Sequence, residues 1–132
     1  MISQALKSII TDNAEVIGLI GSDDLVVAER GTGAQYVVII DNGKARVVDT
    51  IKEIKRSEIQ VLISGYPVLT GEKIGGRVIE LLEGGVGRTV TSGGCAYDIR
   101  AVNVKNDPVL IDWAGVSGFS VNLTVFYREG VA

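Results

Sequence analysis

The chain has 132 residues, a length that predicts one domain spanning residues 1–132. A hydrophobic share of 46% with 22% charged residues is typical of a globular protein with a core and argues against a disordered chain. The formal charge of -3 argues against nucleic acid as the main partner, because binding to phosphates needs clustered lysine and arginine.

Other features of the composition indicate where the chain folds. No apolar run approaches the roughly 20 residues of a membrane span, and the N-terminus lacks the basic and apolar regions of a secretory signal. Cys95 has no second cysteine to pair with, which fits a reducing compartment. These features predict folding in a cytoplasm without a membrane partner.

Apolar residues recur at intervals of three and four along residues 2–20, which predicts an amphipathic helix. We expect an interruption near Asn13 and an end at Gly21. The stripe consists of Ile2, Leu6, Ile9, Ile10, Val16, Ile17 and Ile20.

The next pattern is "YVVIIDNGKARVV" at 36–48, where two strand-like runs flank Asn42-Gly43. Asn-Gly suits a type I′ turn, in which both central residues need a positive φ. The segment therefore predicts a β-hairpin.

The stretch "EIQVLISG" at 58–65 alternates as a strand does, with Ile59, Val61 and Ile63 on one face. Gln60 and Ser64 lie on the other face, but Leu62 lies there too. We therefore expect the second face to be partly covered as well.

A second helix is predicted from Thr70, as its N-cap, to about Glu83, with Gly84 and Gly85 closing it. Gly75 and Gly76 each cost a helix roughly 1 kcal/mol. We expect that their missing side chains let the helix approach the sheet closely. The apolar stripe is Ile74, Val78, Leu81 and Leu82.

The glycine-rich segment at 84–94 is expected to be mobile, and a strand is predicted at 95–104. In that strand Tyr97, Ile99 and Ala101 share one face, whereas the following valines take the opposite phase. A change of phase within a strand predicts a bulge.

A turn at 106–108, a short strand at 109–113 and a second turn lead to the last strand, "FSVNLTVFY" at 119–127. Its apolar residues alternate with small polar ones, and a slip by one residue would expose all of them. The order of elements predicts an α+β fold, a mainly antiparallel sheet with two helices packed on one face.

The sequence offers little for catalysis. It contains no histidine, so Cys95 lacks the usual base of a thiol nucleophile and is predicted to be a small buried apolar residue. "GGVGRTV" at 84–90 lacks the first glycine and the lysine of a phosphate-binding loop. The carboxylates are too scattered to predict a metal site. We therefore expect no catalytic, cofactor-binding or metal-binding residues, and no enzyme.

A few conspicuous residues are candidates for an interface. Tyr66 and Trp113 lie near predicted turns, where aromatic residues serve either as interface anchors or as part of the core. Arg77 and Arg88 are candidates to pair across a subunit contact, or to lie on a solvated surface. Arg30, which lies in the segment 28–35, is a further candidate for an interface.

Two stretches carry a resemblance to a known group of proteins. They are "SEIQVLISGYPVLTGEKIGGRVIELLEG" at 57–84 and "NDPVLIDWAGVSGFSVNLTVFYRE" at 106–129. With the N-terminal helix and the strands before them, the chain resembles the tail-terminator, tail-completion and minor-capsid proteins at the head–tail junction of long-tailed phages.

The resemblance implies a structural virion protein, made in the host cytoplasm, that forms a homo-oligomeric ring, usually a hexamer, at the head-proximal end of the tail. Such a ring stops the tail tube from growing and joins it to the head connector, so its partners are the tail tube protein, the connector or neck proteins and other copies of itself. DNA would be passing cargo, which a protein of net negative charge repels. From their predicted flexibility, the segments 28–35 and 84–95 are our candidates for contacts that become ordered on assembly.

Two other classes remain open at this stage. One is a small cytosolic module that binds a protein or peptide at an exposed sheet edge or helix groove. The other is an enzyme, which has the least support in the sequence.

Overall fold

The computed structural model describes residues 2–20, 25–27, 35–41, 46–48, 51–113 and 116–131. The helices are α1 (Ile2–Thr11), α2 (Ala14–Ile20) and α3 (Val68–Gly84). The strands are β1 (Leu25–Val27), β2 (Tyr36–Asp41), β3 (Arg46–Val48), β4 (Ile51–Ser64), β5 (Thr89–Ser92), β6 (Cys95–Val104), β7 (Val109–Trp113) and β8 (Val116–Val131).

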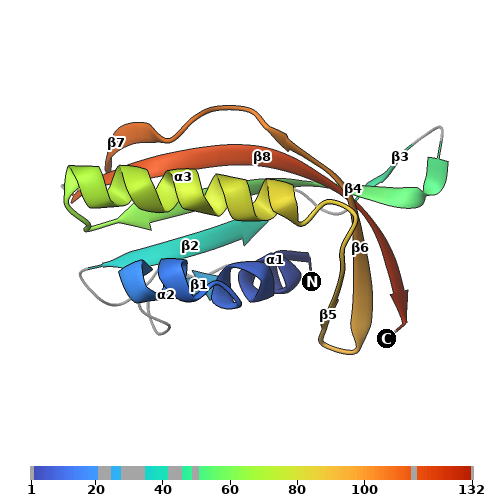
Figure 1. Cartoon of the computed structure of the whole chain (residues 1–132). Coiled ribbons are helices and arrows are strands. Elements are labelled where there is room, and N and C mark those ends of the chain that lie inside the picture. The colour runs from blue at the N-terminus through green and yellow to red at the C-terminus, as the bar shows by residue number, and fades with distance from the viewer. Residues whose placement is uncertain are drawn as a thin grey trace.

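Two long antiparallel strands, β4 and β8, form the centre of one curled sheet (Figure 1). They pair without interruption from Lys55 opposite Tyr127 to Ser64 opposite Gly118. Shorter strands flank them in tandem: β2 and β3 follow one another along β4, and β6 and β7 follow one another along β8. The outermost strands are β1, which runs parallel to β2, and β5, which pairs with β6.

The three helices cover one face of this sheet, so the predicted α+β fold is confirmed (Figure 1). The described residues form three helices where we expected two, because the N-terminal helix divides at the expected place. The Asn13 side chain accepts a hydrogen bond from the backbone N–H of Val16 at 3.0 Å. Asn13 thus caps α2, and its preference for a cap over a helix interior explains the break.

The core between helices and sheet holds the apolar residues of the predicted stripes. Ile17, Leu81 and Val102 lie partly buried at its margin. The helices contribute Ile2, Ala5, Leu6, Ile9, Ile10, Val16, Ile20, Ile74, Val78 and Leu82, and the sheet contributes Val37, Ile39, Ile59, Val61, Ile63, Tyr97, Ile99, Phe119, Val121, Leu123, Val125 and Tyr127.

The start of α3 differs from the prediction. The helix begins at Val68, directly after Pro67, and no side-chain hydrogen bond caps it, so Thr70 lies inside the first turn. Proline at the boundary fixes the backbone and carries no N–H, which lets the helix start without a capping side chain. At the other end the helix includes Gly84 and stops at Gly85, as expected.

Close approach to α3 occurs at two glycines, only one of which was expected. A Cβ atom at Gly75 would lie 2.8 Å from the Pro108 ring, so this glycine does permit close packing. Gly76 has open space around it, so the expectation for Gly76 is wrong. Gly71 is the second close approach, because a Cβ there would lie 2.8 Å from the Phe119 ring.

The predicted hairpin between β2 and β3 is wrong, although both runs are strands. β2 pairs with β4 along its length and ends with Asp41 opposite Ile59, and β3 pairs with β4 from Arg46 opposite Arg56. A hairpin with the short β3 would give β2 at most three pairs, whereas β4 offers it six and a buried apolar neighbour. The dipeptide Asn42-Gly43 itself lies outside the described residues.

The segment 84–94 was expected to be mobile, but it forms turns and the strand β5. Gly93 and Gly94 both have positive φ (58° and 80°) and connect β5 to β6 as a tight hairpin, with Ser92 opposite Cys95. Two glycines between strand-like runs are a hairpin signal that the sequence reading missed.

The predicted bulge in β6 is confirmed. The register shifts between Ile99 and Ala101, which leaves Arg100 as the additional residue. Ala101 is exposed and does not share the face of Tyr97 and Ile99.

The opposite face of the sheet is partly covered, as Leu62 indicated. Leu62 is buried there with Tyr36 and Val38, and Ile40 and Ile111 pack against them. Next to this cluster the face becomes polar and charged. The sheet thus has a face covered by helices and an open face, and both bear on the function.

Candidate interaction surfaces

The buried and half-buried polar groups of the described residues include one cysteine and two tyrosines near each other. No group of three or more histidine, cysteine or carboxylate side chains converges in this part of the chain. Cys95 is half-buried against the core. The rings of Tyr97 and Tyr127 lie 5.8 Å apart. Burial raises the pKa of Tyr97 to about 12 and raises that of Tyr127. Both phenols therefore stay protonated near neutral pH.

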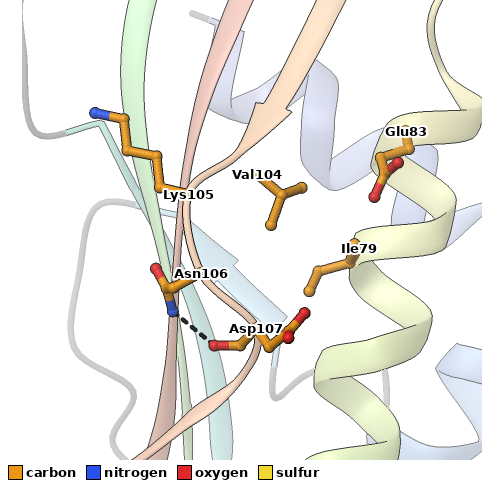
Figure 2. Close-up of a pocket in the computed structure, with 6 residues that line it drawn as sticks. All are labelled: Ile79, Glu83, Val104, Lys105, Asn106 and Asp107. Atoms are coloured by element: carbon orange, nitrogen blue, oxygen red, sulfur yellow. Dashed lines mark hydrogen bonds between the residues drawn. The ribbon is translucent and has the colours of Figure 1, made fainter.

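A pocket of about 300 Å³ lies between the C-terminal half of α3 and the segment that links β6 to β7 (Figure 2). Ile79 and Val104 supply apolar walls, and the carboxylates of Glu83 and Asp107 lie at its rim. Lys105 points away from the pocket in Figure 2. Its Nζ donates to Glu58 at 2.6 Å. The pocket has two acidic groups but no arrangement of acid, base and nucleophile.

The open face of the sheet carries ion pairs whose residues lie on β4, on β6 and just after β6. Glu58 accepts hydrogen bonds from Lys105 and, at 3.0 Å, from the Thr124 hydroxyl. The hydrogen bond from Lys105 is the main reason why the pKa of Glu58 lies below its ordinary value. Arg100 pairs with Asp98 at 3.1 Å on the same face. These are exposed pairs, so they define the polarity of the face more than they add stability.

Two of the predicted interface residues make contacts inside the chain. The Tyr66 hydroxyl donates to the backbone oxygen of Ile20 at 3.2 Å, and its half-buried ring packs against the core. Arg77 lies midway along α3 and pairs with Glu15 and Glu80, both at 3.0 Å. Arg77 thus ties α3 to α2.

The other predicted interface residues lie apart from these. Arg88 is exposed in the turn between α3 and β5, and its side chain makes no ion pair with any described residue. Trp113 ends β7, but its side chain lies outside the described part, as does the whole of Arg30. The five predicted residues therefore do not form one described cluster.

The sequence reading missed the exposed apolar residues. Val68 and Leu69 begin α3 with 54% and 81% of their surface exposed, and Val109 and Leu110 begin β7 with 49% and 56% exposed. These four residues form what we call the apolar end. Leu110 lies opposite Phe119, whose ring contacts the Gly71 position, so β7 and the first turn of α3 lie at the same end of the molecule (Figure 1).

One further large apolar residue is exposed among the described residues. Val86, 44% exposed, lies just beyond the C-terminal end of α3, two residues before Arg88. Exposed apolar side chains gathered in one region, as at the apolar end, often mark contacts with other proteins. The hydrophobicity of "PVLTG" at 67–71 was visible in the sequence, but only the fold placed it beside β7.

None of the helices in the described part of the chain is long and apolar enough to cross a membrane.

Comparison with known proteins gives a likeness in fold. Neither a protein-family model nor a curated protein matches the sequence. Among solved structures, the chain is similar to one from the virion of a native gene transfer agent particle. The two share 14% sequence identity with a TM-score of 0.62, over 97% of this chain and 94% of the other. At this identity the likeness is one of fold.

Proposed function

We propose that this chain is a structural protein of a phage-like virion. The observation that carries the proposal is the likeness in fold to a virion chain over nearly the full length of both chains. A fold hosts many functions, so the likeness is an argument by analogy. The exposed apolar end and the ion pairs on the open face support it, since such surfaces serve for contacts with proteins.

Within a virion, we propose a ring at the head-proximal end of the tail, usually of six subunits. The ring ends the tail tube and joins it to the head connector, as the resemblance of residues 57–84 and 106–129 implies. Tail tube and connector proteins would then contact its two sides, while DNA passes through the ring as cargo. The protein works as a scaffold in the virion and is assembled in the host cytoplasm.

The experiment that tests this function is electron microscopy of particles assembled without the protein. Overlong tails indicate that it terminates the tube, and tails of normal length detached from heads indicate that it joins them. Resupplying the protein restores normal particles in either case. Normal, infectious or transfer-competent particles formed in its absence overturn the proposal.

A second candidate is a peptide-binding module, and the free strand edges favour it. Among the described strands, β1, β3, β5 and β7 each pair with one other strand only, and the edge of such a strand is where a peptide can add a further strand. Particles unaffected by loss of the protein, together with a protein that is monomeric in solution, support this second candidate.

A further inference from the structure

Charged side chains at the two ends of α3 differ from those in its middle. Arg77, in the middle, pairs with two glutamates. Glu72 and Lys73 near the first turn, and Glu83 and Arg88 near the last, are all exposed, and none of them makes an ion pair with a described residue. Each end of the helix thus presents one acid and one base that have no ion-pair partner in the described part of the chain.

Exposed apolar residues accompany both of these charged ends. Glu72 lies four residues after Val68, so the two share one face of the helix beside the apolar end. At the other end Arg88 lies two residues after the exposed Val86. Among the described residues, all large exposed apolar side chains lie at one or the other of these ends.

The charged side chains at the two ends of α3 cannot pair with one another within one chain. α3 has 17 residues, and at 1.5 Å per residue its ends lie about 25 Å apart. A contact between two different surface regions of identical chains is heterologous, and it closes into a ring when the rotation between neighbours permits.

We propose that a second copy of this chain docks head to tail, with the turn at 85–88 of one copy against the apolar end of the next. In this contact Val86 packs on Val68 and Leu69, Arg88 faces Glu72, and Glu83 faces Lys73. The acidic pocket rim of Glu83 and Asp107 adds negative potential for the lysine. The inference rests on the proposed ring and names its subunit contact.

The contact is distinguishable from a symmetric one. If the apolar ends of two copies met each other around a two-fold axis, Glu72 could face Lys73 of the partner copy, but Arg88 and Glu83 would have no part. The complementary charges and the exposed valine at the far end favour the head-to-tail arrangement, because it uses all four charges.

The test is a charge-reversal cycle on the full chain, with mass measured by light scattering after size exclusion over a range of concentrations. We expect Arg88→Glu and Glu72→Lys each to weaken self-association by about three- to tenfold, and the double variant to recover most of the loss. Asp12→Lys is the matched control, an exposed acid without an ion-pair partner in the described part of the chain, and should associate like the parent.

Each other outcome overturns the contact. A parent protein that is monomeric at every concentration excludes it, as do reversals that associate like the parent. Sensitivity to Glu72→Lys but not to Arg88→Glu indicates the symmetric arrangement. The measurement of tail length by electron microscopy does not depend on any of these three outcomes. A wrong contact therefore does not contradict the proposed function.

Discussion

The two faces of β8 serve different purposes, although they alternate along one strand. On the side covered by the helices, Phe119, Val121, Leu123, Val125 and Tyr127 are all buried. On the open side the intervening residues are polar or charged, apart from Phe126. Stability and surface chemistry are thus separated here by the two-residue period of a strand.

The open face uses hydrogen bonds between neighbouring strands. Gln60 donates to the Ser120 hydroxyl at 3.2 Å, and Thr124 donates to Glu58 at 3.0 Å. Thr124 lies directly opposite Glu58, and Ser120 lies diagonally from Gln60, so both bonds depend on the register in which β4 and β8 align. Burial on the covered face supplies most of the free energy that holds them together.

The largest expected effect is a cavity on the covered face. Leu123→Ala should lower the free energy of unfolding by about 2–5 kcal/mol, because the side chain is fully buried. Asn122→Ala changes the adjacent residue on the open face and should cost about 0.5 kcal/mol or less. Urea denaturation of both variants measures the difference, and equal losses would contradict the separation of the two faces.

Helix α3 allows the same comparison between its packed and solvent-exposed sides. Gly75→Ala should destabilise by about 1–3 kcal/mol, since the new methyl group would meet Pro108 at 2.8 Å. Gly76→Ala should stabilise by up to about 1 kcal/mol, because it has open space and alanine favours a helix. Thermal and urea unfolding measure both; a stabilising Gly75→Ala would show that Pro108 yields easily.

In the gap between β6 and β7, a side chain takes the place of a neighbouring strand along β8. Asn106 accepts a hydrogen bond from the backbone N–H of Asn122 at 2.9 Å and donates to the backbone oxygen of Ser120 at 3.0 Å. Asn106→Ala should therefore cost about 1–3 kcal/mol in unfolding free energy, with faster hydrogen exchange at the Asn122 amide. Asn103→Ala, at an exposed position in β6, is the control; equal effects would contradict this role for Asn106.

The smallest expected effect is a dependence of stability on pH. Hydrogen bonds from Lys105 and Lys55 place the pKa values of Glu58 and Glu129 below the ordinary 4.5. Their stabilisation is therefore fully present above pH 4.5 and is lost as the pH falls through the lower folded-state values. Because these pairs are exposed, the change is small and weakens with salt.

Glu58→Gln isolates one part of this effect. The free energy of unfolding, measured between pH 3 and 6 in low salt, should change less in the variant than in the parent. The difference should be roughly the contribution of one exposed ion pair. Identical pH profiles for both proteins would mean that the Glu58–Lys105 pair contributes nothing measurable.

The sequence predicted the apolar faces well and the partners of the strands poorly. The stripe on α1 and α2, the break at Asn13 and the bulge in β6 all follow from patterns within about ten residues. The pairing of β2 with β4, a ladder of six residue pairs, is longer than any hairpin that the local turn signal offers. The hairpin at Gly93-Gly94 has a local signal in the sequence, but the many glycines of the segment 84–94 predict mobility instead.

The candidate surfaces were less predictable than the fold. Arg77 and Arg88 looked equivalent in the sequence, yet one is paired with two glutamates and the other has no ion-pair partner among the described residues. Val68 and Leu69 gave no sign of exposure, because they continue an apolar pattern. Exposure depends on what the rest of the chain covers, and a local pattern does not contain that information.

By itself the sequence determined which side chains of each strand and helix turn inward, because the periods of 2 and 3.6 residues fix the faces before any partner is chosen. Only the tertiary structure decided which strand pairs with which, and which end of α3 meets β7. These pairings depend on which long-range contacts bury the most area and form the most hydrogen bonds over the whole molecule. Those totals outweigh the local preference of any one segment.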